Sequence, residues 1–168
     1  IVYSTSTNDG TSWSDYADVS EHYYEADSGL PALAHSGDYI YLVYLDNGDN
    51  DQVNDPNGND ADDRDGDIYF QRSDDEGETW EALKVLSLFE DDEENDLDYT
   101  SILLQYRTDI AATGSYVHVA WIDYDSYNGG YDIIYTKSSN NGNSWSEPES
   151  ISTASSPGGV TVAASGSN

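Results

Sequence analysis

Aspartate and asparagine residues crowd the stretch between residues 46 and 67, and their side-chain oxygens are the groups in this sequence best suited to bind a cation. Ca²⁺ takes about six to eight hard oxygen ligands from a compact loop. The EF-hand pattern is not met, because Ala61 and Arg72 stand where its first and last ligands would fall. The predicted Ca²⁺ ligands are Asp46, Asp49, Asp51, Asp60, Asp62, Asp63, Asp65 and Asp67. The alternative is a solvated acidic loop.

A shorter stretch later in the chain repeats this chemistry. Asp46 aligns with Asp123, and Asp67 aligns with Asp132, so acids recur at both ends of two similar connections. We expect a structural Ca²⁺ to clip the flanking strands together, although the same acids are also suited to capping strand ends. The predicted ligands here are Asp123, Asp125, Asn128 and Asp132. The acidic run 91–96 is a weaker candidate, because consecutive acids usually form a solvated face.

Catalytic patterns are absent from the sequence. Glycoside hydrolysis needs two placed carboxylates, and abundant acids without a motif do not indicate them. The three histidines fit no metal-site or triad spacing, and His118 is expected to pack inside a strand.

An eight-residue pattern occurs three times and organises the elements around these loops. Its frame is Ser-x-(Asp/Asn)-(Asp/Glu/Asn)-Gly-x-(Ser/Thr)-Trp. Gly accepts the positive φ of a tight turn, the Asp or Asn accepts backbone N–H bonds, and the hydroxyls fasten the loop. The Trp is expected to start the next strand and to bury a large apolar area. The predicted structural residues are Ser6, Asn8, Gly10, Trp13, Ser73, Asp75, Gly77, Trp80, Ser138, Asn140, Gly142 and Trp145.

This pattern resembles the Asp-box, also called the bacterial neuraminidase repeat, of sialidase-like β-propellers. The family's Asp at the third position stands only at Asp75, while Asn8 and Asn140 replace it in the other two copies. The resemblance implies a propeller fold, and it does not by itself imply sialidase activity, because many Asp-box propellers are not sialidases.

The resemblance implies a set of catalytic residues that this sequence only partly contains. The family uses three arginines on the sugar carboxylate, a Tyr with a Glu as nucleophile, and an Asp as acid/base. This chain has only Arg64, Arg72 and Arg107, and the family's Arg-Ile-Pro signature is absent. Arg64 is expected to neutralise the acidic loop, and Arg72 is expected to be structural. We therefore predict that the chain is not an enzyme.

Strand-like segments follow one order twice. The first round is 32–37, 38–46, 67–72 and 80–88, and the second is 109–114, 116–123, 132–137 and 145–152. Four antiparallel strands per repeat, with the motif between the third and fourth, predict an all-β fold of propeller blades, about two and a half in this chain. We expect one domain over 1–168, with a partial blade at 1–20, blades at 31–88 and 109–153, and the first strand of another at 160–168.

Incomplete blades expose unpaired backbone groups. The two ends are expected to pair with each other, with further sequence of a longer chain, or with the next copy of the chain. Pairing with the next copy gives donor-strand exchange and, if the operation does not close, a filament. The lack of Met, even at position 1, leads us to expect a processed product or a fragment.

Charge narrows the classes of partner. The 168 residues carry 34 acidic and 5 basic side chains, a net charge of −29, and no Cys. Nucleic acid and anionic membranes are disfavoured as partners, because both attract basic surfaces. Cations are favoured, and adaptation to high salt is the alternative explanation for the acidity.

The sequence therefore predicts a non-catalytic, extracellular or cell-surface structural or adhesive propeller module, stabilised by Ca²⁺. It is expected to assemble with further copies through edge-strand pairing into a filament or surface array. The alternative function is a carbohydrate-binding or sialidase-like glycoside hydrolase domain, with glycans as partners.

Overall fold

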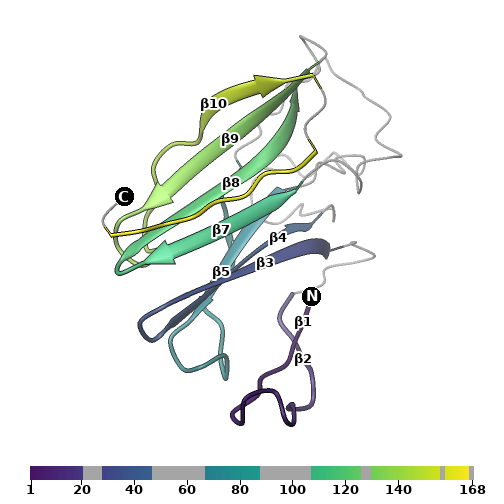
Figure 1. Ribbon diagram of the computed structural model, residues 1–168, viewed down its shortest axis with the longest axis vertical. Helices are drawn as coiled ribbons and strands as arrows, with labels where there is room; N and C mark the ends of the chain where they lie inside the picture. Colours follow the sequence, from purple (N-terminus) through teal and green to yellow (C-terminus); the bar gives the residue numbers. More distant parts are fainter. Residues whose placement is uncertain (21–27, 47–66, 88–106, 126–129, 156–157, 167–168) are drawn as a thin grey trace, which may run out of the picture.

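The computed structural model describes residues 1–20, 28–46, 67–87, 107–125, 130–155 and 158–166, and in these ranges it contains strands and no helix (Figure 1). All strand pairs are antiparallel and form three sheets. The first sheet contains β1 (Val2–Tyr3) and β2 (Ala17–Asp18). The second sheet contains β3 (Ser28–Ser36), β4 (Tyr39–Asp46), β5 (Asp67–Ser73) and β6 (Lys84–Val85). The third sheet contains β7 (Thr108–Thr113), β8 (Tyr116–Asp125), β9 (Gly130–Ser138) and β10 (Glu149–Ala154).

The second and third sheets repeat one construction. In each, four strands lie in chain order, and the motif connects the third strand to the fourth. The expected all-β fold of antiparallel four-stranded sheets is confirmed. The division into propeller blades stays a prediction. The acidic stretch 47–66 and the run 91–96 lie outside the described residues.

The strand that follows each motif begins later than the sequence predicts. The fourth strand was expected to begin at the motif Trp, but β2, β6 and β10 begin later, at Ala17, Lys84 and Glu149. In between, the residue after each Trp donates one backbone bond across the hairpin, as from Glu81 N–H to the Arg72 carbonyl at 2.8 Å. This backbone bond, together with side-chain bonds across the hairpin, holds it closed without forming a continuous ladder.

The segment 158–166 was expected to contain a strand from residue 160, and the structure has none there. Instead the Val162 N–H donates to a carboxylate oxygen of Asp109, in β7, at 2.8 Å. A side chain thus takes the place of a backbone partner, and the segment runs alongside β7 (Figure 1).

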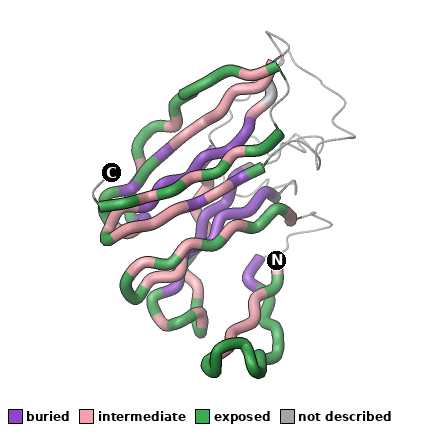
Figure 2. Tube along the Cα trace, viewed as in Figure 1, coloured by how far each residue is buried: buried purple, intermediate pink, exposed green. Residues whose placement is uncertain are grey.

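β4 is buried on both faces, and this explains its nearly continuous apolar sequence (Figure 2). Tyr41, Val43 and Leu45 belong to a core cluster shared with the third sheet. Leu42 and Tyr44 belong to a second cluster, shared with the first sheet. Burying each of these side chains contributes roughly 1.5–3 kcal/mol, so β4 is where the three sheets are held together.

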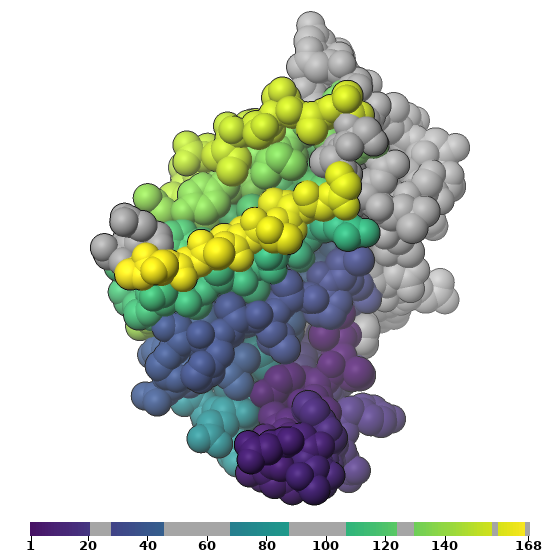
Figure 3. Space-filling model, in the orientation of Figure 1, coloured from purple at the N-terminus to yellow at the C-terminus, as the bar shows by residue number. Residues whose placement is uncertain are grey.

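The three sheets follow one another along the long axis of the molecule, in chain order (Figure 3). The first strands of the second and third sheets, β3 and β7, lie side by side. The Thr108 hydroxyl of β7 donates to the carbonyl of Leu30 in β3 at 3.1 Å, and the Ser36 hydroxyl donates to the carbonyl of Gly114 at 3.0 Å. No helix in the described part of the chain is long and apolar enough to cross a membrane.

Candidate functional site

Three motif loops, at residues 6–13, 73–80 and 138–145, are fastened by their own side chains. In the second motif loop Ser73 Oγ accepts the Gly77 N–H at 2.8 Å and donates to Asp75 at 2.7 Å. The Asp75 carboxylate also accepts the Thr79 N–H at 2.8 Å and the Thr79 hydroxyl at 2.6 Å. These bonds, first those from Thr79 and then that from Ser73, lower the pKa of Asp75 to about 2.

Asparagine supports the same geometry in the other two motif loops. In the third, Ser138 Oγ accepts the Gly142 N–H at 2.9 Å, and Asn140 Oδ1 accepts the Ser144 N–H at 2.9 Å. In the first, the corresponding bonds, both 2.9 Å long, join Ser6 to Gly10 and Asn8 to Ser12. The expected self-fastened turn is therefore present in every copy of the motif.

Each motif loop has two successive residues at positive φ, where the sequence indicated only the glycine. They are Asp9 and Gly10, Glu76 and Gly77, and Asn141 and Gly142. Asp and Asn tolerate this left-handed conformation better than most residues. This explains why short polar residues stand before two of the three glycines.

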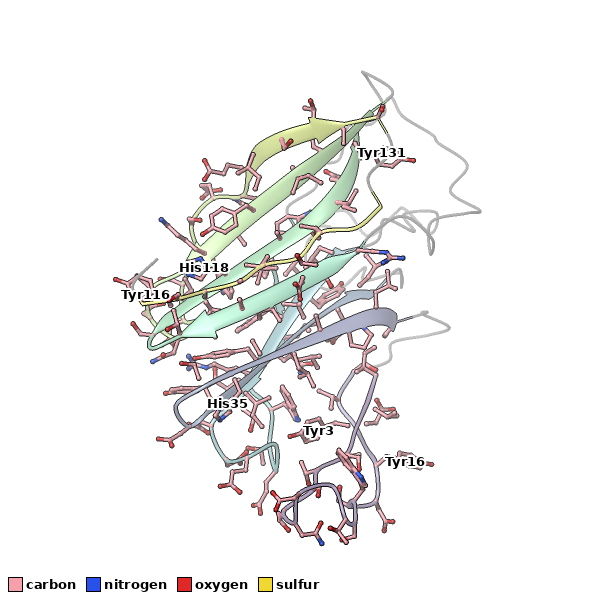
Figure 4. The ribbon with its side chains drawn as sticks, viewed as in Figure 1. Tyr3, Tyr16, His35, Tyr116, His118 and Tyr131 are labelled. Atoms are coloured by element: carbon pink, nitrogen blue, oxygen red, sulfur yellow. The ribbon has the colours of Figure 1, made fainter. Side chains whose placement is uncertain are left out.

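An aromatic ring from the preceding sheet lies against the second and third motif loops. Tyr3 of β1 packs onto Gly77 and meets Trp80 edge to face, with ring centroids 5.4 Å apart (Figure 4). Phe70 of β5 packs onto Gly142 and meets Trp145 in the same way at 4.8 Å. A Cβ at Gly142 would lie 2.5 Å from Phe70 Cζ, so glycine is needed for this approach as well as for the turn.

The sequence interpretation missed these rings although it contained a signal for them. Tyr3, Phe70 and Tyr135 each stand three residues before the motif Ser. Aromatic residues are common in strands, so their recurrence at one position did not distinguish them from ordinary strand formers.

Cationic side chains reinforce the contact at the third motif loop. The Arg72 guanidinium donates to the Asn141 carbonyl and to Asn143 Oδ1, the latter at 3.0 Å, and pairs with Glu81 at 2.7 Å. Lys84 Nζ donates to the Gly142 carbonyl at 2.6 Å. The bond to Glu81 is the main reason that the pKa of Arg72 is raised. Arg72, expected to be structural, therefore ties the second sheet to the third.

The third sheet carries the counterparts of these contacting residues. Tyr135 stacks on His118, with centroids 6.1 Å apart, and its hydroxyl lies 2.7 Å from His118 Nδ1. Phe70 stacks on Tyr41 in the same way at 6.2 Å. Burial, and secondarily Lys137, lowers the pKa of His118, so the ring is neutral at pH 7. His118 is buried in the strand, as the sequence indicated.

Four of the predicted Ca²⁺ ligands occupy partner positions on neighbouring strands. Asp46 lies directly opposite Asp67 in the β4–β5 register, and Asp123 lies directly opposite Asp132 in the β8–β9 register. Asp125 pairs with Gly130 at the end of the second ladder. The other predicted ligands lie outside the described residues: Asp49, Asp51, Asp60, Asp62, Asp63, Asp65 and Asn128. Within the described ranges no group of three acidic or histidine side chains could hold a metal ion, so the Ca²⁺ site stays a prediction.

Comparison with known proteins supports the fold. No family model matches the sequence, and no curated protein matches it. The fold is similar to 13 chains of known structure. One of them is Hadza microbial sialidase Hz136, with a TM-score of 0.53, 14% sequence identity, and coverage of 84% of this chain and 29% of that one. The chain thus has a sialidase-like β fold and spans less than a third of the length of that sialidase.

Proposed function

We propose that the chain is a non-catalytic, structural or adhesive module of an extracellular or cell-surface β-propeller. In this proposal the motif loops are Asp-boxes and the three sheets are successive blades. The observation that carries it is the ring of one sheet seated on the motif Gly and Trp of the next, at Tyr3 and again at Phe70. The Ser and the Asp or Asn side chains of each motif bond within the loop, so they support the turn rather than a ligand in this proposal.

Such a module acts mechanically. The aromatic rings, the motif loops and the basic side chains of Arg72 and Lys84 hold neighbouring sheets together in a rigid row. Among the described strands β1 pairs only with β2, so its other edge offers backbone donors and acceptors to an incoming strand. Strand addition at such an edge is a common way to join protein chains. Repeated between copies, it produces a filament or a surface array.

Ca²⁺ is proposed as the stabilising ion on the basis of the opposed carboxylates. Like charges directly opposite one another on neighbouring strands are destabilising. Such a pair stands at the same register position in two sheets of a chain whose net charge is −29. A hard divalent cation held by these acids and by the acidic loops would remove the repulsion.

The test of this proposal is the oligomeric state with and without EGTA, measured by mass photometry and negative-stain microscopy. We expect ordered assemblies in Ca²⁺ that come apart when EGTA is added. A protein that stays monomeric at all concentrations and is indifferent to EGTA would contradict both the assembly and the metal.

A carbohydrate-binding or sialidase-like hydrolase domain is the second candidate, and the fold likeness to a sialidase favours it. A glycan array and a fluorogenic sialoside assay test this candidate. Specific glycan binding or sialoside turnover would replace the structural proposal, and the absence of both would support it.

A further inference from the structure

We propose that this chain docks head to tail onto a second copy of itself, through the same ring-and-loop contact that joins its own sheets. The first motif loop of one copy would receive Tyr135 of another. The inference rests on the proposed structural function and adds to it the residues that meet. The contact occurs twice within the chain, and the two halves of a third contact stand at opposite ends of the molecule.

The first motif loop presents one half of this contact to solvent. Gly10 is exposed, and among the residues that the structure describes only the ring of Trp13, in its own loop, lies within 4 Å of a Cβ built on it. Gly142, at the corresponding place, is buried under Phe70. Trp13 is 66% exposed, whereas its counterpart Trp145 is half-buried against the core.

Neighbouring apolar residues extend the exposed surface. Val2 is 65% exposed, while Tyr69, at the same place in β5, is 3% exposed. Tyr16 is 77% exposed and points away from the molecule in Figure 4, while its counterpart Leu83 packs against a core cluster. The counterparts of these residues in the second sheet, Tyr69, Trp80 and Leu83, all pack in the cluster shared with the first sheet. Val2, Trp13 and Tyr16, together with the first motif loop, are here called the loop face.

The third sheet presents the other half. Tyr135 and His118 stack as Phe70 and Tyr41 do, yet none of the three motif glycines, all of them described, lies against Tyr135. The segment 158–166 lies beside β7, as β7 lies beside β3. The segment therefore takes the position that the first strand of a following sheet would occupy. Beside the second sheet β7 holds this position, and the third motif loop still lies over Phe70. Tyr135, His118 and Lys137 are called the ring face.

Charge complements the shape of the two faces. Lys137 is exposed and occupies the place of Arg72, whose guanidinium bonds to the third motif loop. The loop face carries Asp9 at the position of Asn141. Docking would bring Lys137, one of the chain's five basic residues, against the exposed Asp9, in a molecule whose net charge of −29 otherwise opposes self-association. A second copy carries both faces in matching form, so it is the occupant to which the geometry points.

Crosslinking tests this contact cleanly, because the chain has no cysteine. Lys137→Cys and Thr11→Cys proteins are purified separately, mixed, and treated with a short bifunctional maleimide. Their counterparts inside the chain are Arg72 and Asn143, whose side chains are joined by a 3.0 Å hydrogen bond. The control mixes Lys137→Cys with Glu147→Cys, which also places an exposed cysteine on a motif hairpin, outside the proposed contact.

We expect a crosslinked heterodimer in the first mixture, at a yield at least about tenfold above the control. Adding Trp13→Ala to the Thr11→Cys protein should lower that yield by about tenfold, because truncating a Trp at the centre of an interface is among the most costly changes. Trp13 is mostly exposed in the single chain, so at a concentration where the protein is monomeric this variant should keep the wild-type melting temperature.

Equal yields in the test and control mixtures would overturn the ring-and-loop contact. If the wild-type chain still assembled by mass photometry, only this contact would be rejected and edge-strand assembly would stand. If the wild-type chain were monomeric at all concentrations, both would be rejected.

Discussion

At the scale of single residues, a motif glycine can meet two requirements: the positive φ of the turn and the close approach of a ring from the preceding sheet. Gly142 has a φ of +79° and also lies under the ring of Phe70. Gly10 has nearly the same φ, +77°, with no ring of another sheet above it. The two glycines therefore separate the requirement of the turn from the requirement of the contact.

Replacing each glycine by alanine should show this difference. Gly10→Ala should cost roughly 1–2 kcal/mol of the free energy of unfolding, because alanine resists positive φ. Gly142→Ala should cost a further 1–3 kcal/mol, roughly, because its Cβ collides with Phe70. Urea denaturation of the two variants measures both values. Equal losses would mean that the ring contact adds nothing to the requirement for glycine.

The carboxylate of Asp75 makes the second motif loop sensitive to acid. Its folded pKa of about 2 lies below the ordinary value of 3.8, so its bonds stabilise the fold fully above about pH 4 and are lost as the pH falls toward 2. We expect Asp75→Asn to melt close to wild type at pH 7, because Asn140 supports the same turn, and to remove this part of the acid dependence. Asp75→Ala should melt lower than both at pH 7.

Thermal melts of the three proteins between pH 2 and pH 7 test this expectation. An acid dependence of Asp75→Asn identical to that of wild type would show that another group is responsible.

The self-fastened turns could be predicted from the sequence because all their bonds are local. The seating of Tyr3 and Phe70 could not be predicted, because it depends on how one sheet is placed against the next. The late starts of β6 and β10 were missed for a related reason. The residue after each motif Trp makes one backbone bond across the hairpin and further bonds through side chains, and strand propensity alone does not indicate that arrangement.

At the scale of elements, Arg72 couples β5 to a loop 69 residues further along the chain, about one full repeat of the motif. Its guanidinium satisfies the Asn141 carbonyl and Asn143 and pairs with Glu81. It also stacks over Tyr39 at 5.1 Å. These contacts bind the second and third sheets beside the core cluster, because Arg72 is the register partner of Tyr41 in β4.

Removing this guanidinium should therefore loosen the joint between the two sheets. We expect Arg72→Ala to cost roughly 2–4 kcal/mol of the free energy of unfolding, because partly buried acceptors lose their donor. Lys137→Ala, at the matching place in the third sheet but exposed, is the control and should change stability by less than about 0.5 kcal/mol. Equal effects of the two substitutions in urea denaturation would contradict the special role of Arg72.

At the scale of the whole molecule, the sequence predicted the repeat and the order of strands, because hydrophobic pattern and motif spacing recur together. β4 shows why the apolar runs are continuous: a strand between two other sheets needs apolar residues on both faces. The metal could not be settled in the same way, because most of its expected ligands lie outside the described residues.

Removing Ca²⁺ should destabilise the molecule if the ion is held as proposed. We expect the melting temperature to fall in EGTA, because the proposed ion would no longer offset the repulsion between acids at register-partner positions, Asp46 with Asp67 and Asp123 with Asp132. Raising NaCl in EGTA should restore part of the loss by screening. Melting curves that superimpose with and without EGTA would argue against a structural Ca²⁺ and in favour of adaptation to high salt.

The paired acids also show that the register of two strands does not depend on the length of the connection between them. In the second sheet Asp46 and Asp67 are register partners with twenty residues between them, and in the third sheet Asp123 and Asp132 are register partners with eight between them. The sheets are alike although the inserts differ, and closing a longer loop costs little extra free energy. The connection between the second and third strands of each sheet is therefore a suitable position at which to insert peptides or small domains. A displayed epitope could be exchanged there while the framework beneath it keeps its register.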